Sequence, residues 1–116
     1  MATKKAKKEK IITPYWQQIV DCWFDFCYQH FNERPTFDGS APIDLKNIIK
    51  ALQDRATTSN IEWTLETALS RFKNFLSYAI QDDWLRKNFL LFNINRQKDK
   101  IFFNIKSFFN KNQYYE

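Results

Sequence analysis

The sequence predicts an all-α protein that folds as one compact domain of four to five helices. One glycine and three prolines in 116 residues are too few for a protein of many tight turns and short strands. Twelve Phe, five Tyr and four Trp provide enough apolar surface for a core without disulfides. We expect a disordered basic tail at residues 1–12, a helical domain at 13–111 and a short C-terminal tail at 112–116.

The first helix is expected to begin near Thr13, with Pro14 in its first turn, where the missing N–H of proline is tolerated. Apolar residues then recur at the three- and four-residue spacing of one helix face. They are Trp16, Ile19, Val20, Trp23, Cys27 and Phe31. Phe24 and Tyr28 widen this stripe, whereas Phe26 lies well away from it. A stripe this broad predicts burial against more than one neighbouring element.

Two prolines and the only glycine fall in the run from Glu33 to Pro42, which predicts a loop. Phe37 is expected to pin that loop to the core. A second helix should begin around Ser40 to Pro42 and end in the TTSN run that starts at Thr57. Its inward side chains are expected to be Leu45, Ile48, Ile49 and Leu52.

Thr64 is the predicted N-cap of a third helix, because its hydroxyl can accept a backbone N–H of the first turn. Glu66 is well placed near the positive end of that helix dipole. The apolar stripe comprises Leu65, Leu69, Phe72, Leu76, Ala79 and Ile80, with Ala68 and Phe75 beside it. A short helical turn over Asp82 to Lys87, capped by the two aspartates, should present Trp84 and Leu85.

A last helix is predicted to start from an N-cap at Asn93. Its inner face should carry Ile94, Ile101, Ile105 and Phe108, flanked by Phe102 and Phe109. Asn95, Arg96 and Gln97, near its start, are residue types that read base edges when a helix enters a major groove. The side opposite the inner face combines basic residues with Phe103, which is unusual for a helix face that is only solvated.

Charge is segregated along the chain. Residues 1–10 have a net charge of +4, residues 11–83 a net charge of −4 with six Lys/Arg against ten Asp/Glu, and residues 84–116 a net charge of +5. The basic character, with a pI of about 9.2, therefore belongs to the two ends. This pattern indicates that a polyanion would be met by the ends and repelled by the body.

Residues for catalysis are scarce. His30 follows Cys27 by three positions, but no second Cys/His cluster can complete a zinc site. The pair also lacks a third group that would orient it as a base and a nucleophile. One glycine is too few for a phosphate-cradling loop. We therefore predict no catalytic residue, no metal site, no cofactor and no enzymatic activity; a small enzyme would instead require a deep polar pocket around Cys27 and His30.

Cys22 and Cys27 would lie about 140° apart on a helix, which is poor geometry for a disulfide. We expect free, buried or half-buried thiols and a cytoplasmic location. No apolar run approaches a membrane span and the N-terminus lacks a secretory signal, so we expect no membrane contact.

The last helix and the basic tail are the predicted nucleic-acid-binding parts. Arg96, Lys100 and Lys106 would contact phosphates, while Phe103 would stack on a base or anchor the contact. Four tail lysines would add sequence-independent attraction: Lys4, Lys5, Lys7 and Lys8. Two alternatives remain open at this point. The face could be a solvated surface only, or its aromatics and the terminal tyrosines could form a protein–protein adaptor or a homodimer.

Three stretches resemble small helical proteins encoded by phages and mobile elements, often near replication genes. They are FDGSAPIDLKNIIKAL, WTLETALSRFKNFL and DDWLRKNFLLFNINRQKDKI, within residues 13–106. The resemblance implies a non-enzymatic accessory protein in mobile-element DNA metabolism. Its expected partners are DNA, bound without sequence specificity or with weak specificity, and replication proteins or a second copy of the chain.

A looser similarity is to the C-terminal helical domain of DnaD-type replisome organisers. That family carries an aromatic residue, an isoleucine and a tryptophan at four-residue steps. Leu76, Ile80 and Trp84 match two of these three positions, with leucine in place of tyrosine. The second candidate run, at residues 101–109, matches strictly only at its middle position, Ile105. This similarity also implies DNA binding.

Overall fold

The computed structural model of the chain describes residues 13–114, with side chains placed for residues 13–108. Six helices lie in this part of the chain: α1 (Trp16–Phe31), α2 (Ala41–Thr58), α3 (Leu65–Ala79), α4 (Asp83–Lys87), α5 (Leu91–Arg96) and α6 (Lys98–Tyr114). No strand occurs within the described residues, so the predicted all-α class is confirmed. The predicted tail at 1–12, with Lys4, Lys5, Lys7 and Lys8, lies outside them.

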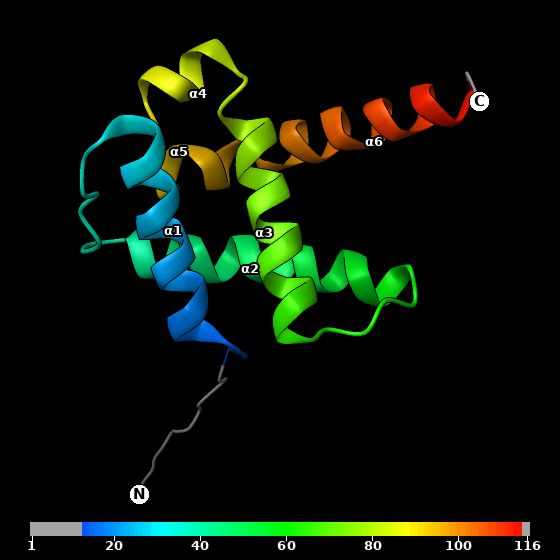
Figure 1. Cartoon of the computed structure of the whole chain (residues 1–116), viewed down its shortest axis with the longest axis horizontal. Coiled ribbons are helices and arrows are strands. Elements are labelled where there is room, and N and C mark those ends of the chain that lie inside the picture. The colour runs from blue at the N-terminus through cyan, green and yellow to red at the C-terminus, as the bar shows by residue number, and fades with distance from the viewer. Residues whose placement is uncertain (1–12, 115–116) are drawn as a thin grey trace, which may run out of the picture.

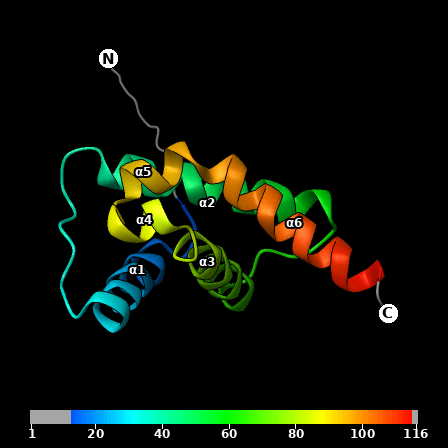
Figure 2. The same cartoon turned by 90° about the horizontal axis from the view of Figure 1, so that it is seen from above.

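The helices form two layers. α1 and α3 lie side by side and run in the same direction, while α2 crosses behind both (Figure 1). Seen from above, α5 and α6 lie on the α2 side of the molecule, and α4 connects the two layers at one end (Figure 2). α6 crosses α3 and extends past it, so that one end of the molecule consists of a projecting basic helix.

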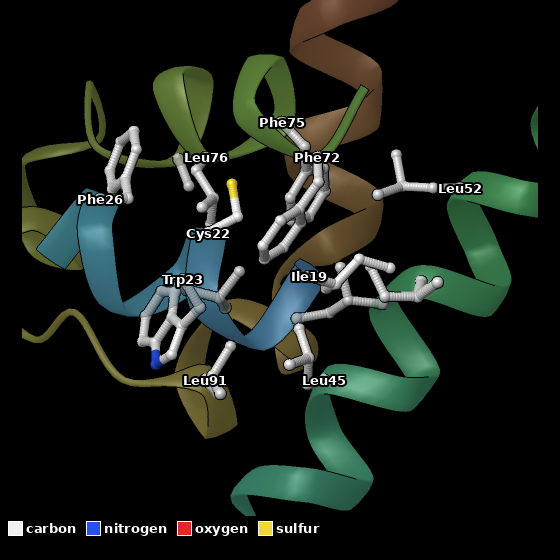
Figure 3. Close-up of a cluster of buried hydrophobic side chains, with 14 of the residues drawn as sticks. Ile19, Cys22, Trp23, Phe26, Leu45, Leu52, Phe72, Phe75, Leu76 and Leu91 are labelled. Atoms are coloured by element: carbon white, nitrogen blue, oxygen red, sulfur yellow. The ribbon is translucent and has the colours of Figure 1, made fainter. Parts of the chain in front are cut away.

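The core lies between these layers. Figure 3 shows side chains from α1, α2, α3 and α5 meeting in one cluster. The largest fully buried side chains are Trp23, Phe72, Phe75, Ile19, Leu45, Ile48, Ile49, Leu76, Leu85 and Ile94. All four inward positions predicted for α2 are buried. The Thr64 cap is also confirmed, because its hydroxyl accepts the Thr67 N–H at 3.1 Å. Leu65 is exposed instead, since the first turn of α3 extends past α2.

Three predictions for α1 were wrong. The helix begins at Trp16 because Tyr15 adopts a left-handed φ of 62°, so Pro14 lies in the preceding turn and not in the first helical turn. Phe26, which falls outside the main stripe, is buried because Phe89 from the segment after α4 packs on it at 5.8 Å between ring centroids. Tyr28 is instead 61% exposed.

The loop before α2 is held as predicted. The ring of Phe37 lies 6.3 Å from that of Trp16 and 5.9 Å from that of Phe24. Aromatic pairs at these separations contribute about 0.5–1.5 kcal/mol beyond their buried area. The loop is therefore anchored to α1 without any regular secondary structure of its own.

The C-terminal region differs most from the prediction. The expected single helix is divided at Gln97, whose N–H donates to the carbonyls of Asn93 and Ile94. Asn93 is therefore not a cap but lies inside α5, and its side chain donates to the Asn88 carbonyl at 3.0 Å. Phe108 is 47% exposed and not buried on an inner face, although its ring lies 5.9 Å from that of Tyr78 in α3. The extra break raises the helix count above the four to five predicted, and α6 continues to Tyr114, beyond residue 111.

We expect Phe72→Ala to lower the free energy of unfolding by about 3–5 kcal/mol, since it leaves a cavity in the centre of the core. Phe103→Ala is the matched control: its ring is exposed, so the loss should stay within about 0.5 kcal/mol. Urea unfolding followed by far-UV circular dichroism measures both. Similar losses for the two variants would contradict the placement of the core.

Candidate nucleic-acid interface

The break at Gln97 divides the predicted basic face between two helices. Arg96 ends α5, with its Cζ 5.2 Å from the ring centroid of Phe92. Lys100 lies in the first turn of α6, and its Nζ is 3.0 Å from Oδ1 of Asp82. Two of the three predicted phosphate contacts therefore already have neighbours within the fold, although both side chains remain accessible to solvent.

Asn95 does not present its amide to a ligand, contrary to the prediction that it reads base edges. Its Nδ2 donates to Oδ1 of Asp44 at 3.0 Å. Asp44 is itself buried and accepts a second hydrogen bond from Ser40 at 2.8 Å. Asn95 thus ties α5 to the start of α2, and the half-buried Gln97 is the C-cap of α5. Of the three residues considered for base reading, only Arg96 is exposed.

Phe103 lies on the outer side of α6 and is 66% exposed. At 100° per residue, Lys100 lies about 60° from Phe103 on one side and Lys106 about 60° on the other. The three residues form an exposed arc about 120° wide, which we call the α6 arc. The helical pattern of the sequence therefore correctly located a mixed basic and aromatic surface.

Lys106 also borders a second feature that sequence reasoning missed. α2, α3 and α6 surround a cavity of about 1100 Å³ that is open to solvent. Its lining is Leu52, Arg55, Ser59, Glu66, Leu69, Ser70, Arg71, Lys73, Asn74, Ser77, Phe102, Ile105 and Lys106. We call it the basic groove, because four cationic side chains and one carboxylate are among these residues. Its cations come from all three helices.

The groove cations are not neutralised by the fold. The ion pairs found among the described residues use Lys50, Arg86, Lys87 and Lys100, and none of the four groove cations takes part in one. Glu66 is the only carboxylate in the described lining. Several unpaired cations around one concave surface create a positive potential that attracts anions.

Arg55 is the most constrained of these cations. Its Cζ lies 3.9 Å from the ring centroid of Phe102, and that ring also packs against Phe75 at 5.1 Å between centroids. A guanidinium over an aromatic face gains cation–π attraction. The position of Arg55 is therefore set by the core contact of α3 with α6.

The sequence offered no signal for the groove. Arg55, Arg71 and Lys73 belong to the segment whose net charge is −4, and we predicted that this segment repels phosphate. The packing of α2 against α3 corrects that expectation, because it gathers three of the six Lys/Arg of the segment on one surface. No spacing within a single helix reveals this, since the residues lie on two different helices.

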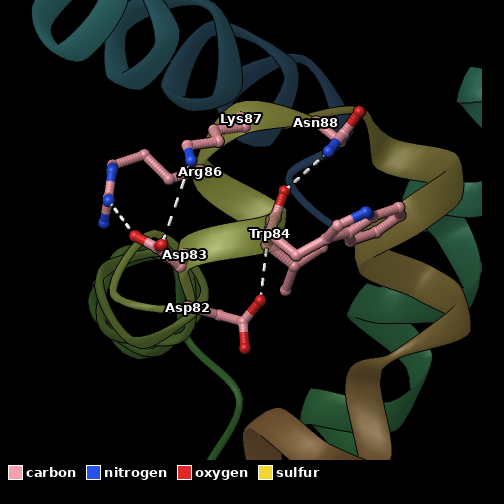
Figure 4. A network of polar contacts seen from close by, with 7 residues as sticks. Asp82, Asp83, Trp84, Arg86, Lys87 and Asn88 are labelled. Atoms are coloured by element: carbon pink, nitrogen blue, oxygen red, sulfur yellow. Dashed lines mark hydrogen bonds and ion pairs between the residues drawn. The ribbon is translucent and has the colours of Figure 1, made fainter.

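The region around α4 carries most of the remaining charged contacts (Figure 4). Asp82 caps α4 by accepting the Leu85 N–H at 2.9 Å. Asp83 pairs with Arg86 and, at 4.0 Å, with Lys87. The Leu85 N–H and then the Lys100 ammonium lower the pKa of Asp82, because both stabilise the charged carboxylate.

Cys27 and His30 do not form a reactive pair of nucleophile and base. Cys22 and Cys27 are free and buried, and burial raises the pKa of Cys27 to about 12. His30 is exposed at the end of α1, with its ring 4.2 Å from that of Phe26. A thiol with so high a pKa is a poor nucleophile at neutral pH. Within residues 13–108 no group of three or more His, Cys, Asp or Glu side chains is arranged to hold a metal ion.

We expect Asp82→Asn to lower the free energy of unfolding at neutral pH by roughly 0.5–1 kcal/mol, through loss of the charged cap and of the Lys100 pair. The folded pKa of Asp82 is lowered, so its stabilisation is complete above the unfolded value of about 3.9 and disappears as the pH falls through the folded pKa. Urea unfolding across an acidic pH series measures this. Asp54→Asn, which removes only the exposed pair with Lys50, is the control; a loss for Asp82→Asn that persists at the lowest pH would contradict the assignment.

Comparisons of the chain with protein-family models, curated proteins and solved structures found no match. None of the described helices is both long and apolar enough to span a bilayer.

Proposed function

We propose that this chain is a non-enzymatic DNA-binding accessory protein of a phage or mobile element, acting in replication. The observation that carries the proposal is the basic groove, where Arg55, Arg71, Lys73 and Lys106 lack an ion-pair partner among the described residues. The resemblance of three sequence stretches to small phage and mobile-element proteins supports the biological setting. The buried free thiols fit a cytoplasmic location.

Lys106 joins the groove to the α6 arc, so one DNA backbone can contact both. From the groove, the chain of phosphates would pass Lys106, cross Phe103 and reach Lys100. Each phosphate that a cation neutralises releases condensed counterions, which favours binding at low salt. The net negative charge of residues 11–83 would limit the contact to the basic groove and the α6 arc. The tail residues Lys4, Lys5, Lys7 and Lys8 would add non-specific attraction.

Phe103 would provide the non-ionic part of the contact. A phenylalanine that is 66% exposed leaves apolar surface in water, which stacking on a base would remove. Because Phe103 lies between Lys100 and Lys106, a backbone held by both lysines brings its bases to the ring. Arg96, exposed at the end of α5, would contact a phosphate beyond Lys100.

We expect Arg71→Gln combined with Lys106→Gln to weaken DNA binding and to reduce the slope of log K against log salt concentration by about 1.4–1.8, since two phosphate contacts are lost. Fluorescence anisotropy of labelled DNA at about 50 and 200 mM salt measures both effects. The double variant Lys50→Gln with Lys87→Gln changes the net charge equally, but both lysines are exposed outside the groove.

The control variant should bind as the unmodified chain does. Equal weakening by the two double variants would mean that net charge, not the groove, attracts the DNA. Undetectable binding of the unmodified chain at micromolar concentration and low salt would refute the proposed function.

A second candidate function is a protein–protein adaptor or homodimer. The exposed aromatic and apolar side chains support it, since Phe103, Trp84, Leu90 and Phe92 are all accessible. Light scattering at several protein concentrations separates the two functions. A dimer that Phe103→Asp dissociates, in a chain that binds no DNA, would favour the adaptor.

A further inference from the structure

The lining of the basic groove is not only ionic. Its apolar lining residues are the half-buried Leu69 and Ile105 and, beneath them, the buried Leu52 and Phe102. Ser70 and Asn74, on the exposed side of α3, place hydroxyl and amide groups among them. A ligand that matches this lining combines negative charge for the cations, apolar planar surface for the apolar side chains, and hydrogen-bonding edges for the hydroxyl and amide groups.

Arg55 is preorganised for a planar ligand. Phe102 supports one face of its guanidinium at 3.9 Å, and Arg55 is exposed and unpaired by any carboxylate of the described residues. A nucleobase stacks readily on a guanidinium plane, and prior ordering of the side chain reduces the entropy lost on binding. Lysine at this position could supply the charge but not the plane.

Whether the nucleic acid is single-stranded or double-stranded determines how much of the groove lining it can contact. A duplex presents phosphates outside and keeps its bases stacked inside, so it would contact the groove cations and leave the apolar floor in water. A single strand presents phosphates and unstacked bases to the same surface. A duplex also covers a wide area, and the segment around the groove has a net charge of −4, which penalises a wide polyanion more than a narrow one.

We infer that the basic groove is a site for single-stranded nucleic acid, with phosphates on Arg71 and Lys106 and one base stacked on the outer face of Arg55. This inference rests on the proposed function and specifies its ligand: the chain binds DNA strands that are already separated. The lengths of strand that such sites hold are commonly about 4–16 nucleotides.

Anisotropy titrations of the full-length chain test the inference with a labelled single strand of about 15 nucleotides and a hairpin duplex of matching sequence. The single strand should bind at least about tenfold more tightly, which corresponds to one stacked base. Arg55→Lys keeps the charge and should weaken single-strand binding about five- to tenfold, with duplex binding unchanged. Arg34→Lys is the matched control, because Arg34 also packs over a phenylalanine, Phe24, but outside the groove.

Unfolding midpoints of both variants establish that each is folded. Duplex binding as tight as single-strand binding would overturn the inference and leave the proposed DNA-binding function in place. A single-strand preference that Arg55→Lys does not reduce would place the strand elsewhere and also overturn it. Binding of neither form would refute the proposed function itself.

Discussion

The packing of Phe102 against both Phe75 and Arg55 links the core of this protein to its candidate binding surface. Its contact with Phe75 holds α6 against α3. The same ring also packs on the Arg55 guanidinium at the end of α2. One aromatic side chain therefore joins the three helices that line the groove. Stability and the arrangement of cations depend on the same contact, so a change there would alter both.

Most of the helices could be predicted because their signals are local. Thr64 caps α3, Asp82 caps α4, and the four inward residues of α2 follow helical spacing. The break at Gln97 could not be predicted, because no glycine or proline marks it. It is accompanied by a tertiary hydrogen bond, from Asn95 of α5 to the buried Asp44 of α2, between residues far apart in the sequence.

The candidate site was predicted only in part, for a related reason. The α6 arc lies on one helix, so periodicity was enough to find Lys100, Phe103 and Lys106 together. The basic groove combines α2, α3 and α6, and net charge along the sequence pointed away from it. Charge summed over a segment describes a long-range field, whereas a binding surface depends on which few side chains the packing brings together. Here the acidic segment contributes Arg55, Arg71 and Lys73 to a cavity whose lining holds four cationic side chains.

The Asp82 carboxylate has a further consequence for the α6 arc. It holds Lys100 at 3.0 Å while also capping α4, so any phosphate that approaches Lys100 must compete with an anion already in place. The protein thus carries an internal competitor at one end of the arc, whereas none of the four groove cations forms an ion pair within the described residues. A polyanion would bind the basic groove first and displace Asp82 from Lys100 last, so that contact would proceed from the groove along the α6 arc. The same carboxylate that stabilises the fold would therefore make contact at the α4 end of the arc the weakest and most readily reversed.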